Sequence, residues 1–122
     1  MCCGCFGYKQ IFLPVIGEFS LDVIEGGCIV EAPEATVTYL GYKSQKKLRG
    51  MNIQKIVTSK EEGRSILQDV LSSQRLEVVS ARTVTCKRQD GSTHLYSLTY
   101  VKLLFSYGAV RLNFTPIFRI ER

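Results

Sequence analysis

The fold is decided by residues 75–105, RLEVVSARTVTCKRQDGSTHLYSLTYVKLLF. Two runs rich in β-branched and aromatic residues, Arg75–Arg88 and Thr93–Phe105, flank the four residues Gln89–Ser92. Such runs are typical of β-strands, and an Asp-Gly pair between them is a strong signal of a type I′ hairpin turn. The segment therefore predicts a long antiparallel hairpin whose turn is centred on that pair.

This position of the turn determines which side chains of the hairpin share a face. It pairs Lys87 with His94 and Cys86 with Leu95, and alternate residues then point to opposite faces. The predicted apolar face carries Val78, Val84, Cys86, Leu95, Val101, Leu103 and Phe105. The predicted wetter face carries Thr83, Thr85, Lys87, His94, Tyr96, Tyr100 and Lys102.

The spacing of apolar residues predicts one element on each side of the hairpin. Ser59–Glu62 fits a capping box, and apolar residues then recur at helical spacing, which predicts a helix at about residues 60–73. Ala109–Ile120 alternates apolar and polar residues and predicts a closing strand. Pro116 within this run indicates an edge strand or a bulge.

The first half of the chain predicts short strands around one long loop. The polar, basic stretch Gly41–Gly50 lies between glycines and predicts a long loop or a hairpin tip. We expect a mainly β, α+β fold, an antiparallel sheet or barrel with one short helix packed outside. We also expect a cysteine-bearing arm at residues 1–9 and a single domain at residues 10–122. The predicted strands are Gln10–Ile16, Glu18–Ile24, Cys28–Ala32, Ala35–Leu40 and Asn52–Val57.

Length and composition exclude several classes of protein. The chain has 122 residues, of which 45% are hydrophobic and 22% charged, as in an ordinary globular domain rather than a disordered chain. Its apolar runs fall far short of the roughly 20 residues of a transmembrane helix. It also opens without the pattern of a secretory signal. We therefore expect no membrane partner and a cytoplasmic location.

Metal binding and catalysis have little support in the sequence. Cys2, Cys3 and Cys5 lack the paired spacing of a structural zinc site. We therefore favour reduced thiols without a functional role over zinc binding or acylation. The only histidine is His94, and no nucleophile elbow, phosphate loop or pair of spaced carboxylates is present. We expect a protein that is not an enzyme and that holds no cofactor or metal.

Positive charge is the clearest chemical feature. The chain carries 16 Lys and Arg against 11 Asp and Glu, a net charge of +5. Within the predicted long loop, Lys43, Lys46, Lys47 and Arg49 can hold phosphates, and Tyr39 and Tyr42 are available to stack on bases, although such runs are also typical of a solvated loop. A second set on the polar sheet faces suits nucleic acid or a subunit interface: Lys87, Tyr96, Tyr100, Lys102, Arg111 and Arg119.

The order of elements resembles that of the tail-tube proteins of contractile phages and of the haemolysin-coregulated tube protein of type VI secretion. The matching residues are GYKSQKKLRGMNIQKIVTSKEEGRSILQDVLSSQRLEVV and RQDGSTHLYSLTYVKL, in the order loop, strand, helix and hairpin. The resemblance implies a structural, virion-associated subunit that assembles into rings or tubes through its sheet edges and the long loop. The residues alone leave an alternative, a small basic nucleic-acid-binding module.

Overall fold

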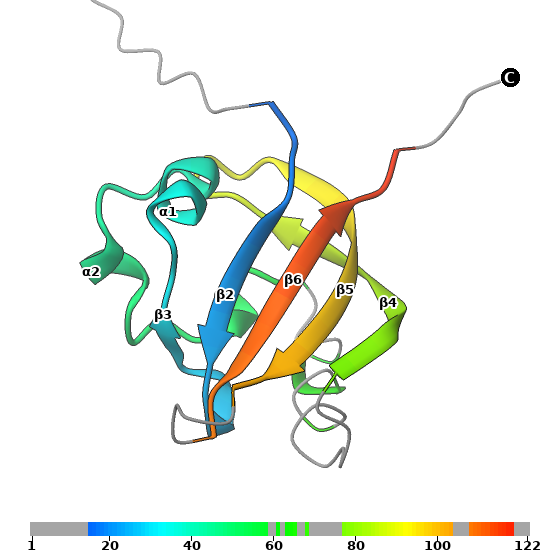
Figure 1. The fold of residues 1–122 in the computed structure, drawn as a ribbon. Coiled ribbons are helices and arrows are strands. Elements are labelled where there is room, and N and C mark those ends of the chain that lie inside the picture. Colours follow the sequence, from blue (N-terminus) through cyan, green and yellow to red (C-terminus); the bar gives the residue numbers. More distant parts are fainter. Residues whose placement is uncertain are drawn as a thin grey trace, which may run out of the picture.

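The computed structural model describes residues 15–58, 61, 63–65, 68, 77–103 and 108–118. These residues form a five-stranded sheet in the order β3-β2-β6-β5-β4, with neighbouring strands antiparallel (Figure 1). The predicted fold class is confirmed. The elements are β2 (Phe19–Val23), the 3-10 helix η1 (Glu25–Gly27), β3 (Ile29–Glu31), α1 (Glu34–Leu40), α2 (Gln45–Leu48), the 3-10 helix η2 (Ile53–Lys55), β4 (Glu77–Lys87), β5 (Thr93–Lys102) and β6 (Val110–Pro116).

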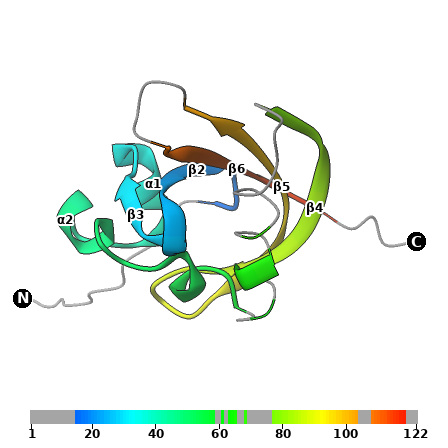
Figure 2. The same cartoon turned by 90° about the horizontal axis from the view of Figure 1, so that it is seen from below.

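Several predicted segments lie wholly or partly outside the described residues. These are the arm at residues 1–9, most of the strand Gln10–Ile16, and most of the helix at residues 60–73. The described residues of that last segment, 61, 63–65 and 68, are helical as predicted. Seen from below the sheet, α1 and α2 lie to one side of the curved strands (Figure 2).

The register of the β4–β5 hairpin differs by one residue from the prediction. The Arg88 N–H donates to the carbonyl of Ser92 at 2.9 Å, and the Gly91 N–H donates to the carbonyl of Arg88 at 3.0 Å. Gly91 has a φ of 92°, so the turn is a loop of Gln89 to Gly91 that ends in a left-handed glycine, in place of a type I′ turn. Cys86 is consequently paired with His94.

This shift of register exchanges the two faces of β5. Val84 and Cys86 of β4 are buried as predicted, but Tyr96 and Tyr100 of β5 are buried as well, at 2% and 5% exposure. The prediction that both tyrosines lie on the wetter face is therefore wrong. A slip of one residue is sufficient, because successive side chains of a strand point to opposite faces.

The run Ala35–Leu40, predicted as a strand, is helical and forms most of α1. Pro33 precedes the helix, where its fixed φ and missing N–H are tolerated. Gly41 ends it with a φ of 88° and donates its N–H to the carbonyls of Val37 and Thr38. Tertiary packing overrides the strand preference of the β-branched residues, because helical spacing turns four side chains into the core: Thr36, Val37, Tyr39 and Leu40.

Two further predictions in this half are corrected. The predicted loop Gly41–Gly50 contains a helix, α2. The predicted strand Asn52–Val57 contains the 3-10 helix η2, whose first turn is capped by the Asn52 side chain accepting the Gln54 N–H at 2.9 Å. The protein therefore has more helix than the single short one expected.

Strand β6 lies in the middle of the sheet, between β2 and β5. Pro116 is its last residue and marks neither an edge strand nor a bulge. The next N–H, of Ile117, donates to the carbonyl of Leu95 on β5 at 3.0 Å, so the proline nitrogen faces the β2 side. Phe19, the first residue of β2, pairs with Phe114, so Pro116 lies beyond the end of the β2–β6 pairing. The chain thus enters β2 and leaves β6 at the same end of the sheet (Figure 1).

Thr36 of α1 completes the edge of β2 where β3 does not reach. β3 pairs with β2 only at Asp22 and Val23. The Thr36 hydroxyl donates to the Ser20 carbonyl at 2.8 Å and accepts from the Ser20 N–H at 3.3 Å. A side chain on a helix therefore satisfies two backbone groups of the strand.

We expect Thr36→Val to lower the free energy of unfolding by about 1–3 kcal/mol, because it leaves both Ser20 groups without this partner. Urea unfolding followed by circular dichroism measures the change. The matched control is Thr38→Val, an exposed position of the same helix, for which we expect about 0.5 kcal/mol or less. Equal losses in the two variants would show that the effect is one of helix propensity.

Candidate functional site

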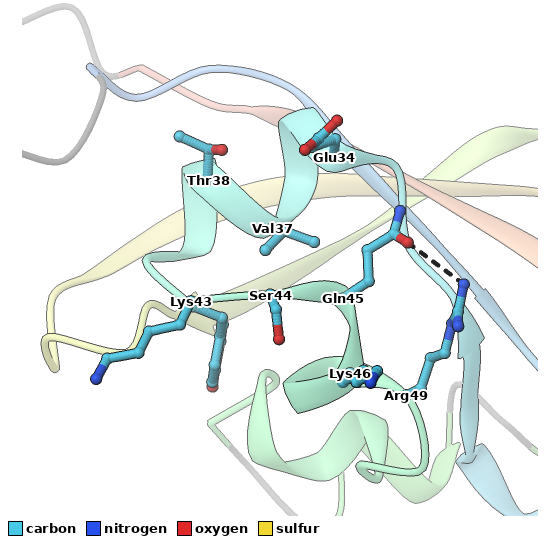
Figure 3. Close-up of a pocket in the computed structure, with 9 residues that line it drawn as sticks. Glu34, Val37, Thr38, Lys43, Ser44, Gln45, Lys46 and Arg49 are labelled. Carbon is cyan, nitrogen blue, oxygen red and sulfur yellow. Dashed lines mark hydrogen bonds between the residues drawn. The ribbon is translucent and has the colours of Figure 1, made fainter.

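The structure gathers four of the predicted contact residues at one place. Tyr42, Lys43, Lys46 and Arg49 line a groove of about 410 Å³ between α1 and α2, which we call the α1–α2 groove. Lys47 is exposed on α2 but does not line this groove. Figure 3 shows the residues of α1, of α2 and of the connection between them that line the groove.

The second predicted set is dispersed. Tyr96 and Tyr100 lie in the core, and Arg119 lies outside the described residues. Arg111 lies on the outer face of the sheet and is engaged by Asp22, with Nε donating to Oδ1 at 2.8 Å and Nη2 donating to Oδ2 at 3.1 Å. This bidentate bond raises the pKa of the Arg111 guanidinium above its ordinary value.

A polar cluster lies in the core, between α1 and the sheet. We call Arg88, Tyr39 and Tyr96 the core cluster. Arg88 is only 7% exposed, and its guanidinium carbon lies 4.1 Å from the centroid of the Tyr39 ring. The hydroxyls of Tyr39 and Tyr96 are hydrogen-bonded to each other. Burial, followed by this hydrogen bond, raises the pKa of Tyr96, so its hydroxyl keeps its proton.

An aromatic wall surrounds the core cluster. The Phe19 ring stacks on Phe114 with centroids 4.4 Å apart and on Tyr39 with centroids 5.3 Å apart. Tyr96 meets Phe19 edge to face at 5.2 Å. His94, predicted to face solvent, is half-buried, with its ring 5.6 Å from that of Tyr96. The polar groups of the cluster therefore lie in a largely apolar, low-dielectric surrounding.

The core cluster joins elements that are far apart in the sequence. The Gln89 N–H, next to Arg88 in the hairpin turn, donates to the carbonyl of Leu40 at the end of α1 at 2.8 Å. The Tyr39 hydroxyl accepts the N–H of Gly17, in the segment that leads into β2, at 3.1 Å. The core cluster therefore connects α1, the hairpin, β5 and the segment ahead of β2.

The cations that line the α1–α2 groove differ in their contacts. Nη2 of Arg49 donates to Glu31 at 3.2 Å and to the Gln45 side chain at 3.3 Å. Gln45 in turn donates to the carbonyl of Ala32 at 2.8 Å, so its side chain is held in place. Burial raises the pKa of the half-buried Tyr42. The lining consists of Glu34, Val37, Thr38, Tyr42, Lys43, Ser44, Gln45, Lys46 and Arg49.

In the described part of the chain, no group of three His, Cys, Asp or Glu side chains is placed to hold a metal ion. The cysteines at positions 2, 3 and 5 lie outside it. None of the helices described here is long and apolar enough to cross a bilayer.

No protein-family model and no curated protein sequence matches the chain. Solved structures do match it. A PAS domain from Desulfitobacterium hafniense is 16% identical, with a TM-score of 0.66 over 84% of this chain and 95% of that one. The PAS domain of an HTR-like protein from Haloarcula marismortui is 17% identical, with a TM-score of 0.63 over 80% of this chain and 83% of that one. These likenesses show that the chain has a PAS fold.

A third match carries a small molecule. The PAS domain of a LuxR-family transcriptional regulator from Burkholderia thailandensis, in complex with ethanol, is 13% identical to this chain. Its TM-score is 0.63, and the match covers 84% of this chain and 91% of that domain.

The predicted resemblance to tail-tube and secretion-tube proteins is wrong, because these matches are to PAS domains. The ring or tube assembly and the virion association lose their support with it. The matches to PAS domains leave the nucleic-acid-binding alternative without support as well. The element order was misleading because two runs assigned to strands, Ala35–Leu40 and Asn52–Val57, contain helices.

Proposed function

We propose that this chain is a non-enzymatic sensory module, which receives its signal at the core cluster and passes it to the strands attached to that cluster. The observation that carries the proposal is a PAS fold whose core holds Arg88 over the ring of Tyr39, whose hydroxyl is in turn bonded to that of Tyr96. Structures with the same fold include domains of a sensor histidine kinase/response regulator from Geobacter sulfurreducens and of nitrogen regulation protein NR(II) from Vibrio parahaemolyticus.

The chemistry of the core cluster suits the reception of a signal. Burying a guanidinium costs desolvation free energy. Such a group is retained where its environment compensates for the lost hydration. Its donors and the two phenol hydroxyls suit a small molecule that offers a hydrogen-bond acceptor or a negative charge. In the low dielectric of a core, a new hydrogen-bond acceptor would change the electrostatic interactions among all three groups.

The connections of the core cluster suit the transmission of that signal. Tyr39 is bonded to Gly17 ahead of β2, and Arg88 precedes the residue that is bonded to the end of α1. A ligand acts only through a difference in its affinity for two arrangements. Here the two arrangements would differ in how α1 and the hairpin hold the start of β2.

Removing one hydroxyl tests the coupling. We expect Tyr96→Phe to raise hydrogen exchange at the amides of Gly17 and Gln89 by about tenfold, the equivalent of one lost hydrogen bond. Exchange is followed residue by residue by NMR. The matched control is Tyr100→Phe, a buried tyrosine on the same face of β5 whose hydroxyl makes no hydrogen bond shown among the described residues, and it should leave both amides unchanged.

A response confined to the neighbours of Tyr96 would contradict transmission. Reception is tested separately, by titrating labelled protein with a panel of small alcohols, phenols and carboxylates. The proposal expects at least one compound to shift the amides of Gly17, Arg88 and Tyr96 together, with the shift lost in Tyr96→Phe. Ligands whose effects are the same in both proteins would place reception elsewhere.

The predicted self-association and the predicted cytoplasmic location stay predictions for this chain. Light scattering over a tenfold range of protein concentration tests the first. A stable mass of 13.7 kDa throughout would mean a module that works as a monomer.

A further inference from the structure

The α1–α2 groove combines an apolar floor with a polar rim. Val37 of α1 is 4% exposed and Tyr42 is half-buried, so together they provide an apolar surface at its base. Thr38 and Ser44 also line the groove, and a hydroxyl can donate a hydrogen bond. Its volume of about 410 Å³ falls in the range of small-molecule sites, roughly 300–1,000 Å³.

The charges around the groove do not balance. Three cations line it, Lys43, Lys46 and Arg49, against one carboxylate, that of Glu34. Arg49 is bonded to Glu31 and Gln45, which fixes its position and neutralises part of its charge. Lys43 and Lys46 are exposed and take part in no ion pair shown by the described part of the chain. The excess positive potential therefore belongs to these two lysines, and a concave surface concentrates it.

The two lysines also differ from Lys47, their neighbour. All three are exposed and lie in or next to α2, but Lys47 is outside the groove lining. Simple charge attraction would involve the three equally. A site that recognises shape as well as charge would use only Lys43 and Lys46, and Tyr42 would supply a contact for the body of the ligand.

We propose that the α1–α2 groove binds a small organic oxyanion, whose carboxylate or phosphate group meets Lys43 and Lys46 while its apolar body lies on Tyr42 and Val37. The ligand size follows from the volume of the groove, and the ligand charge follows from the two unengaged ammonium groups. This site is separate from the core cluster, and the inference does not depend on the sensory proposal.

The test uses isothermal titration calorimetry of the full chain with benzoate, phenyl phosphate and benzamide. Benzamide keeps the shape of benzoate and lacks its charge. We expect the two anions to bind and Lys43→Gln/Lys46→Gln to weaken them by about tenfold or more, as charge-assisted hydrogen bonds are lost. The matched control, Lys47→Gln/Lys55→Gln, removes the same net charge from exposed positions outside the groove and should retain binding.

Absence of binding by both anions overturns the inference, and so do three other outcomes. Equal losses in the two double variants would mean attraction to the net charge alone, and equal binding of benzamide would mean that the anionic group is not recognised. Loss of benzoate binding in Tyr96→Phe would place the anion at the core cluster. Retained binding in that variant, with amide shifts at Tyr42 and Ser44, supports the groove.

Discussion

Phe114→Ala is expected to lower the free energy of unfolding by about 3–5 kcal/mol, the usual loss for a large aromatic side chain in a core. Phe114 is 1% exposed on the central strand β6, stacks on Phe19 at 4.4 Å, and lies edge to face with Tyr96 at 6.3 Å. Native domains hold only about 5–15 kcal/mol in total, so the variant should lose a large share of its stability.

Urea unfolding, followed by far-UV circular dichroism, measures this loss. The control is Phe118→Ala, because Phe118 is 63% exposed and its removal should change the free energy of unfolding by about 0.5 kcal/mol. A small effect at Phe114 would mean that the surrounding rings close the cavity. In that case the aromatic wall would be adaptable, and the geometry of the core cluster would not depend on it.

Arg111→Met is expected to lower the free energy of unfolding by about 2–3 kcal/mol. The loss comes from Asp22, whose side chain is only 9% exposed and would be left without its bidentate partner. Arg49→Met removes an ion pair of similar length, but both side chains of that pair are about half exposed, at 49% and 51%. We therefore expect less than about 1 kcal/mol for it.

A double variant separates the loss of the pair from the isolation of its carboxylate. Asp22 and Arg111 are directly paired across β2 and β6, so Asp22→Val/Arg111→Val places two β-branched side chains opposite each other. It should regain most of the stability that Arg111→Met loses, because replacing a buried pair by apolar residues is often close to neutral. A double variant less stable than Arg111→Met would mean that the ion pair itself stabilises the sheet.

Strands were predictable where alternation is strong and local. Glu18–Ile24 and Ala109–Ile120 contain β2 and β6, since their apolar residues recur every second position. The hairpin was predictable in kind but not in register, because Asp90-Gly91 is compatible with both a type I′ turn and a three-residue loop ended by a left-handed glycine. One residue of difference moved Tyr96 from the solvent to the core.

The helix α1 was not predictable from its residues, because Ala35–Leu40 has the composition of a strand and becomes helical through packing. The two candidate sites differ in the same way. Lys43, Lys46 and Arg49 lie within seven residues, so a charge pattern could indicate the groove. The core cluster joins residues 39, 88 and 96, and no local pattern brings them together before the helices and the sheet have packed.

The common end at which the chain enters β2 and leaves β6 has a mechanical consequence. A force applied through the two ends of this unit pulls two adjacent antiparallel strands apart from one side, and it loads their hydrogen bonds one after another instead of all at once. The first contacts to meet that load are those of Gly17 with Tyr39 and of Ser20 with Thr36. Tension in a longer chain would therefore separate β2 from β6, beginning at the end of the sheet where the Tyr39 hydroxyl is bonded to Gly17.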